Sequence, residues 1–264
     1  MIQIPKTAVF IPVRLGSSRL PQKPLIKVKG KTLIEHLLDR AKAAKLPNMI
    51  ALCTTTKPED RIFEKIARKN GVECFRGNEH DILKRFLDAA IKFKVDFIVN
   101  VDGDDVFCDP ELMDKTVQCY LETGASFIKW NNLPLGATPI GVKVDALKKV
   151  CEIKDTLNTE TGWGAYFTDT GLFKVKYLEP EDENLKKPEI RITLDYPEDF
   201  ELVKKVYDRL YVPGKVFTLK AILEFFAKEP ALPEINKGVQ EKYWKRFKKR
   251  ATIKLKKSSR DAQR

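Results

Sequence analysis

The first hundred residues alternate between short apolar runs and longer amphipathic stretches. The apolar runs are rich in β-branched and aromatic side chains and lie at residues 8–13, 49–54, 72–75 and 96–101. Each run is short and bounded by polar or turn-forming residues, which is typical of strands buried in a sheet. The spacing therefore predicts four strands separated by longer connections, and the run at residues 49–54 has the pattern of a buried strand.

The stretches between these runs carry helix signals at their ends. Thr32 and Glu35 have the spacing of a capping box, which predicts that a helix begins here and extends through residue 44. A second helix is predicted through residue 69, and a third over residues 81–93, whose apolar positions recur every three or four residues. Strands and helices in this order predict an α/β fold, a Rossmann-like, mostly parallel sheet with helices on both faces.

The second half of the chain departs from this alternation. The pattern there predicts strands at residues 126–130, 140–144 and 191–195, a helix that ends near residue 210, and a helix over 217–226. Two strands follow each other without a helical stretch between them. We therefore expect one domain over residues 1–240, with a smaller strand-containing insertion at about 124–180.

The composition agrees with a globular domain. The 264 residues are 43% hydrophobic, enough for a large core, and no run approaches the length of about eighteen apolar residues that a membrane span needs. The five cysteines are an odd number without C-x-x-C spacing, which favours reduced thiols over disulfides or a zinc site. These features predict a cytoplasmic protein without a membrane span.

The net charge of +12 is concentrated at the C-terminus. Residues 241–264 contain eleven basic and two acidic side chains, a net charge of +9, so the rest of the chain carries only +3. Such a basic tail could contact a polyanion such as RNA, an anionic membrane surface or an acidic partner. A solvated, partly disordered end is the simpler interpretation of the same charge.

A basic loop follows the first predicted strand, at residues 11–25. Gly16 and two serines allow the backbone to approach an anion closely, and Arg14, Arg19 and Lys23 place three cations within ten residues. The loop lies between a strand and a helix, where open α/β sheets bind their ligands. The sequence therefore predicts a phosphate-binding loop, although its spacing matches neither a P-loop nor a dinucleotide fingerprint.

Acidic residues follow the fourth predicted strand. Asp102, Asp104 and Asp105 lie at the same expected edge of the sheet as the basic loop. Carboxylates this close repel one another unless a cation neutralises them, and on a phosphate-binding fold such oxygen ligands suit Mg²⁺. We therefore expect a magnesium site here.

Four motifs in order carry a resemblance to a known family. The first is Pro12-x-Arg14-x-Gly16-Ser17-x-Arg19-x-Pro21-x-Lys23-Pro24-Leu25, and the others lie at residues 75–86, 101–105 and 193–199. This arrangement resembles the cytidylyltransferases that make CMP-activated acidic sugars, the group of the CMP-KDO and CMP-acylneuraminate synthetases. The likeness is greatest to the branch of the spore coat polysaccharide biosynthesis proteins. Three positions depart from the pattern: Gln22 replaces the usual glycine before the lysine, Asp102 stands where relatives carry an uncharged residue near the base, and Val106 replaces a common proline.

The resemblance implies an activity and a set of site residues. It implies that residues 1–240 form a nucleotidyltransferase domain that couples CTP to an acidic sugar with release of pyrophosphate and needs Mg²⁺, and that the chain is a homodimer with its acceptor and dimerisation region at about 124–180. The implied catalytic residues are Arg14, Lys23 and Asp104, and the implied metal ligands are Asp104 and Asp195. The implied nucleotide-binding residues are Pro12, Val13, Arg14, Gly16, Ser17, Arg19, Lys23, Arg76, Gly77, Asn78, Asp102 and Gly103, and those for the acceptor are Glu160 and Trp163.

Two other functions fit parts of the sequence. Asp102-Gly103-Asp104 after a strand also matches the metal-binding D-x-D of glycosyltransferases that use a nucleotide-sugar donor. The cationic loop favours the nucleotidyltransferase, because a nucleotide-sugar donor needs no triphosphate loop. A non-catalytic polyanion-binding protein built around the basic tail would leave both the loop and the clustered acids unexplained.

Overall fold

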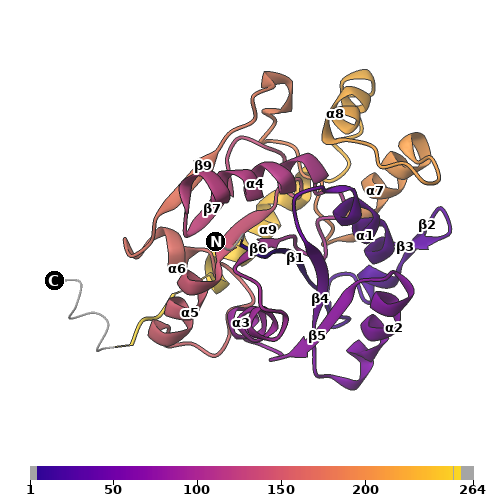
Figure 1. Cartoon of the computed structure of the whole chain (residues 1–264). Coiled ribbons are helices and arrows are strands. Elements are labelled where there is room, and N and C mark those ends of the chain that lie inside the picture. The colour runs from indigo at the N-terminus through magenta and orange to yellow at the C-terminus, as the bar shows by residue number, and fades with distance from the viewer. Residues whose placement is uncertain (1–4, 252, 257–264) are drawn as a thin grey trace.

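A seven-stranded sheet forms the centre of the molecule (Figure 1), in a computed structural model that describes residues 5–251 and 253–256. The strand order is β5-β4-β1-β6-β8-β7-β9. The strands are β1 (Thr7–Pro12), β4 (Met49–Thr55), β5 (Glu73–Gly77), β6 (Phe97–Asn100), β7 (Phe127–Trp130), β8 (Ile140–Lys143) and β9 (Val175–Leu178). Strand β8 runs antiparallel to both of its neighbours, and the other pairs are parallel.

Helices cover both faces of this sheet. The helices are α1 (Leu33–Ala43), α2 (Ile62–Lys69), α3 (Ile82–Phe93), α4 (Pro110–Thr123), α5 (Val144–Ile153), α6 (Ala165–Thr168), α7 (Pro197–Leu210), α8 (Leu219–Lys228) and α9 (Lys237–Arg250). Shorter elements are the 3-10 turns η1 (Lys23–Leu25), η2 (Pro58–Arg61) and η3 (Glu183–Leu185) and a hairpin of β2 (Lys27–Val28) and β3 (Lys31–Thr32). The predicted α/β fold with a mostly parallel sheet is confirmed.

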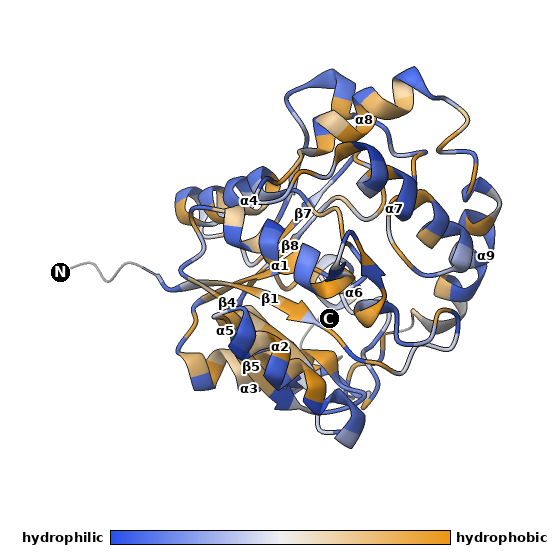
Figure 2. Ribbon diagram, turned by 90° about the vertical axis from the view of Figure 1, so that its right-hand side faces the viewer, coloured by the Kyte–Doolittle hydropathy of each residue, from blue (hydrophilic) through white to orange (hydrophobic). Residues whose placement is uncertain are grey.

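The alternation of side chains along β1 explains the layers. Val9 and Ile11 belong to one core with residues of α1, α2 and α4, whereas Ala8 and Phe10 belong to a second core with α3, α5 and α6. Successive residues of a strand point to opposite faces, so a strand covered on both sides is apolar throughout. Figure 2 shows this hydrophobic stretch along β1. A third core lies beside the sheet, where α7 and α8 pack against the segment that follows β6.

The prediction of a strand at residues 191–195 is wrong. Within the described residues, this segment forms no strand and has one isolated β-bridge, between Arg191 and Leu135. Its backbone forms hydrogen bonds with loop residues instead. The N–H groups of Ile192 and Thr193 donate to the Leu135 carbonyl, and that of Leu194 donates to the Asp104 carbonyl at 2.9 Å. The segment is extended but lies across the carboxyl edge of the sheet, so it brings Asp195 to the residues that follow β6.

The described part of the chain contains no helix that combines the length and the apolar content needed to cross a membrane.

Candidate active site

A cavity of about 810 Å³ opens at the carboxyl ends of β1 and β6. Seven parts of the described chain line it: the basic loop after β1, residues 80–85, the acidic turn after β6, Leu135, residues 156–163, residues 193–195, and the C-terminal residues Tyr243, Arg246, Phe247 and Lys254. Of the predicted site residues, Pro12, Val13, Arg14, Gly16, Ser17, Arg19, Lys23, Asp102, Gly103, Asp104, Glu160, Trp163 and Asp195 line this cavity.

The basic loop is held by its backbone. Val13 donates its N–H to the Cys53 carbonyl at 3.2 Å, and Leu15 donates to an Asp60 carboxylate oxygen at 2.8 Å. Gln22 adopts a left-handed conformation with φ of 54° immediately before η1. Only glycine adopts this φ without strain, which gives a physical reason for the glycine that is usual at this position.

Gly103 lets the ends of β1 and β6 approach each other. Its N–H donates to the Pro12 carbonyl at 3.1 Å, and a Cβ at this position would lie 2.5 Å from that same oxygen. The close approach places the acidic turn directly against the start of the basic loop. The two predicted motifs are therefore one site, joined through the backbone.

Lys23 is the link between the basic loop and the acids. Its Nζ donates to Asp104 Oδ2 at 2.7 Å, to Asp195 Oδ1 at 3.0 Å and to the Leu194 carbonyl at 2.8 Å. Burial lowers the pKa of Lys23, but the charges of Asp104 and Asp195 outweigh it and the pKa lies above its ordinary value. The ammonium therefore stays charged at neutral pH.

Asp195 is surrounded by cations. Besides Lys23, Arg19 donates to its Oδ1 and Arg191 lies 3.4 Å from its Oδ2. Burial raises the pKa of Asp195, but Lys23 and Arg19 outweigh it and the pKa is lowered. Arg191 is 2% exposed and also binds Asp199 through two hydrogen bonds of 2.8 Å, which fixes its guanidinium.

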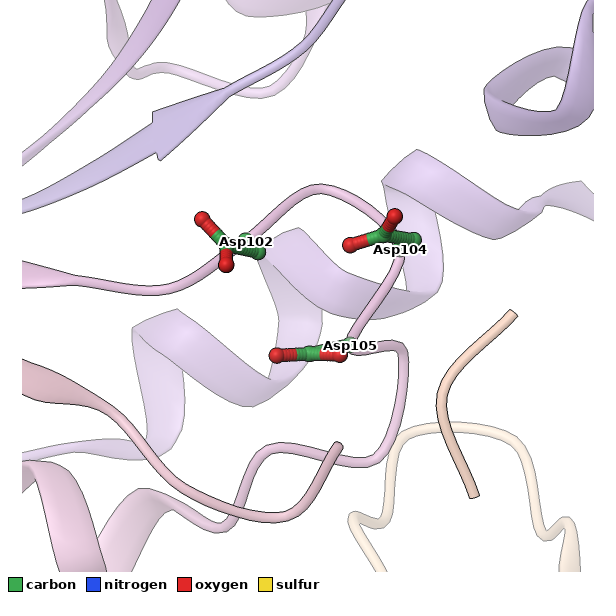
Figure 3. A group of neighbouring side chains, drawn as sticks. All are labelled: Asp102, Asp104 and Asp105. Atoms are coloured by element: carbon green, nitrogen blue, oxygen red, sulfur yellow. The ribbon is translucent and has the colours of Figure 1, made fainter. Parts of the chain in front are cut away.

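Three carboxylates lie together on the turn after β6 (Figure 3). One oxygen each from Asp102, Asp104 and Asp105 falls within a group whose members are no more than 4.8 Å apart. Burial and the charge of Asp104 raise the pKa of Asp102 to about 6 and that of Asp105 well above its ordinary range. The negative charge of this cluster is therefore only partly compensated by Lys23 and Asn100, whose side-chain amide donates to Asp102 at 3.0 Å.

We expect Asp102→Asn to stabilise the metal-free protein at pH 8. The pKa of Asp102 is higher in the folded state than in the unfolded chain, so the folded state binds more protons between about pH 4 and pH 6 and loses stability as the pH rises through this range. Removing the charge is expected to raise the free energy of unfolding by about 1–2 kcal/mol at pH 8 and to change little near pH 4. Denaturant unfolding of both proteins at the two pH values, in EDTA, measures this. An equal change in the free energy of unfolding at the two pH values would contradict the raised pKa of Asp102.

Glu160 bridges two arginines of the cavity lining. Its carboxylate lies 3.0 Å from Arg14 and 2.7 Å from Arg85. Arg85 was not among the predicted site residues; it is 1% exposed and lies on the inner face of α3 among apolar positions. A charged residue on the apolar face of an amphipathic helix is the feature of the sequence that could have indicated it. Trp163 is 6% exposed and packs edge-on against Phe86, Phe127 and Phe167, so most of its ring belongs to the core.

Arg76, Gly77 and Asn78 lie outside the cavity lining. The Arg76 guanidinium donates to the carbonyls of Thr55 at 3.1 Å and Lys57 at 2.7 Å. The Asn78 side chain accepts from the N–H of Asp81 at 2.8 Å, next to the first turn of α3. Their contact with a cytosine base stays a prediction.

The comparisons with known proteins agree with this site. Residues 8–223 match the family model of the cytidylyltransferases. An uncharacterized protein of Methanocaldococcus jannaschii is 34% identical over 240 residues, which cover 89% of this chain and 96% of that protein. The spore coat polysaccharide biosynthesis protein SpsF of Bacillus subtilis is 30% identical over 209 residues, 76% of this chain and 85% of the relative.

A solved structure has the same architecture. The cytidylyltransferase of Leptospira borgpetersenii superposes with a TM-score of 0.79 at 26% identity and covers 87% of this chain and 97% of its own. The family match spans the basic loop, the acidic turn and Asp195, the segments that surround Lys23. The resemblance that the four motifs carried is thereby confirmed: the chain belongs to the cytidylyltransferase family and is a CTP-dependent nucleotidyltransferase.

Proposed function

We propose that the protein transfers CMP from CTP to an anionic sugar with release of pyrophosphate, in a reaction that needs Mg²⁺. The observation that carries this proposal is the position of Lys23, whose ammonium lies at the end of a loop suited to phosphates and within 3.0 Å of Asp104 and Asp195. A cation in that position neutralises the charge of a triphosphate beside the carboxylates that attract a metal.

The chain's own groups supply most of what this reaction requires. Displacement at the α-phosphorus needs the triphosphate charge neutralised and the attacking oxygen held in line with the leaving pyrophosphate, and it needs little covalent help. Arg14, Arg19 and Lys23 provide the positive charge from one side of the cavity. Gly16, with no atom within 4 Å of the position of a Cβ, leaves its backbone open to the phosphates.

The acidic turn fits a divalent cation. Asp102, Asp104 and Asp105 offer carboxylate oxygens on one side, and the raised pKa values of Asp102 and Asp105 reflect negative charge that a cation would relieve. When bound, Mg²⁺ supplies charge stabilisation to the α-phosphate and the leaving group. Asp195 is the less exposed candidate ligand, and its ion pairs with Lys23 and Arg19 give it a second role in positioning these cations.

The acidic sugar is the acceptor that the resemblance implies, and the name of the Bacillus relative associates that protein with polysaccharide synthesis. Glu160 lies between Arg14 of the phosphate loop and Arg85 of α3. We propose that this pair of arginines and Glu160 border the acceptor. A homodimer formed through residues 124–180 stays a prediction.

We expect pyrophosphate release from CTP only when Mg²⁺ and a suitable acceptor are both present. The measurement is a coupled pyrophosphate assay with a panel of 3-deoxy-2-keto sugar acids and sugar phosphates against all four nucleoside triphosphates, with EDTA as the control. Turnover with CTP and one acceptor class, abolished by EDTA, supports the proposal. Transfer of a sugar from a nucleotide-sugar donor, without any pyrophosphate release, would show a glycosyltransferase that uses Asp102 and Asp104 instead.

A further inference from the structure

The C-terminal strap, residues 237–251 and 253–256, packs along one side of the cavity. It consists of α9 and a short extended stretch, and Tyr243, Arg246, Phe247 and Lys254 line the cavity. The charge of this region indicated a solvated end, whereas the described part is attached to the domain. Val239, Tyr243 and Phe247 recur every four residues in an otherwise charged helix, and this spacing forms the face that packs inward.

Hydrogen bonds hold the extended end of the strap in place. Leu255 forms an antiparallel bridge with Lys154, Asp155 donates its N–H to the Lys254 carbonyl at 2.7 Å, and Lys256 donates its N–H to the Ile153 carbonyl at 2.9 Å. The Tyr166 hydroxyl donates to the Lys254 carbonyl at 3.2 Å and accepts from the Lys254 N–H at 3.1 Å. These bonds are spread over the whole end of the strap, so its position beside the cavity is defined.

The helical end of the strap is tied to the acidic side of the cavity. Asn236 donates to Asp199 Oδ1 at 2.8 Å, and Asp199 in turn binds Arg191. The Arg191 guanidinium lies 4.8 Å from the centre of the Tyr243 ring. Burial and the nearby charge of Asp104 raise the pKa of Tyr243, so its hydroxyl stays protonated beside the carboxylates. The same arginine therefore supports both the phosphate side of the cavity and the strap.

The middle of the strap touches the loop that carries Glu160. Gly162 has a φ of +71°, and a Cβ there would lie 2.3 Å from the Ala251 Cβ and 3.6 Å from the Phe247 ring. The strap thus packs directly on residues 156–163, which line the same cavity. The residues that it adds to the lining are two cations and two aromatic rings, without an acid.

The strap lies beyond the part of the chain that defines the family. The family match ends at residue 223, and the nucleotide loop and the acidic turn lie within it. All members of the family use CTP, whereas the acceptor differs between them. A part of the cavity wall that lies outside the residues matched by the family model is therefore suited to recognising the acceptor. We propose, on the basis of the function proposed above, that the strap is one wall of the acceptor subsite and that Arg246 binds the anionic group of the acceptor, with Lys254 adding positive charge beside it.

The test is Arg246→Ala, assayed with the acceptor that supports turnover. We expect the KM for the acceptor to rise on the order of tenfold to a hundredfold, as for the loss of a hydrogen bond to a charged group, while kcat changes less than about threefold. The Kd for CTP alone, measured by calorimetry, should be unchanged. Arg246→Lys should recover part of the acceptor affinity. Whether a sugar carboxylate or a sugar phosphate is turned over identifies the anion.

Two further variants complete the experiment. Lys245→Ala removes a charge from the exposed side of the same helix and should leave every constant unchanged. Tyr166→Phe removes two hydrogen bonds to Lys254 without altering the lining, and should raise the acceptor KM while leaving CTP binding unchanged. An acceptor KM that is unaffected in both Arg246→Ala and Tyr166→Phe overturns the inference and leaves the proposed function standing. Absence of turnover with the whole acceptor panel overturns the proposed function, and this inference with it.

Discussion

Lys23→Met is expected to lower kcat/KM by on the order of 10³. The Lys23 ammonium contacts Asp104 at 2.7 Å and Asp195 at 3.0 Å, and the residue belongs to the loop for which we propose triphosphate binding. Methionine keeps the length and the apolar stem, so the difference measures the charge. A preorganised charge that stabilises a developing anion in a partly buried site contributes more to the transition state than to binding of the ground state. Steady-state pyrophosphate release at varied CTP is the measurement.

The loss of this charge is also expected to destabilise the fold. Asp104 loses its ion pair with Lys23, Asp195 keeps only Arg19 and Arg191, and the free energy of unfolding should fall by about 3 kcal/mol. Lys23→Arg separates the two effects, because it restores a cation but not the point charge at the same position, and should recover stability more fully than rate. Lys27→Met is the control, since Lys27 is exposed on the neighbouring hairpin. Full activity of Lys23→Met in protein shown to be folded would remove Lys23 from the mechanism.

The order of strands and helices along the chain could be predicted because most strands carry their own local pattern. The runs that became β1, β4 and β6 are buried inside the sheet and largely apolar, whereas β5 is a half-buried edge strand that its short run and flanking polar residues still indicated. The stretch 191–195 has the same local pattern but lies outside the sheet, because its hydrogen-bond partners are the loop carbonyls of Leu135 and Asp104. Nothing in five residues specifies whether an extended segment pairs with a strand or with a loop.

The site was predictable where its residues are contiguous and less so where they come together from distant parts of the chain. The basic loop and the acidic turn each carry several functional side chains within fifteen residues, so their composition is unusual. Arg85 is a single charged residue in an apolar pattern, and its role depends on the 2.7 Å contact with Glu160, 75 residues away. For the strap, the strong positive charge concealed the apolar spacing of Val239, Tyr243 and Phe247.

Asp104→Asn and Asp195→Asn are expected to have different effects on rate and stability, although both carboxylates bind Lys23. Asp104→Asn should lower kcat by on the order of 10²–10³ and change the free energy of unfolding by less than about 1 kcal/mol, because the lost attraction to Lys23 is offset by the lost repulsion from Asp102 and Asp105. Asp195→Asn should lower both, with a stability loss of about 3 kcal/mol, since Asp195 is 3% exposed and pairs with Arg19, Lys23 and Arg191.

The double variant of Asp104 and Asp195, and Asp109→Asn as a control, test whether the rate losses arise at one shared site. If both carboxylates act on one Mg²⁺ or through Lys23, the double variant should lose less rate than the product of the two single losses. Asp109→Asn is the matched control: Asp109 lies outside the cavity lining, and its carboxylate accepts the N–H of Glu111 at 2.9 Å, as a helix cap, and that of Leu219 at 2.6 Å. It should cost about 1–2 kcal/mol of stability and little rate. If Asp104→Asn turns over at nearly the rate of the unchanged protein at saturating Mg²⁺, Asp104 is not a metal ligand. If only Asp109→Asn loses rate, the chemistry depends on the fold of α4 rather than on the acidic turn.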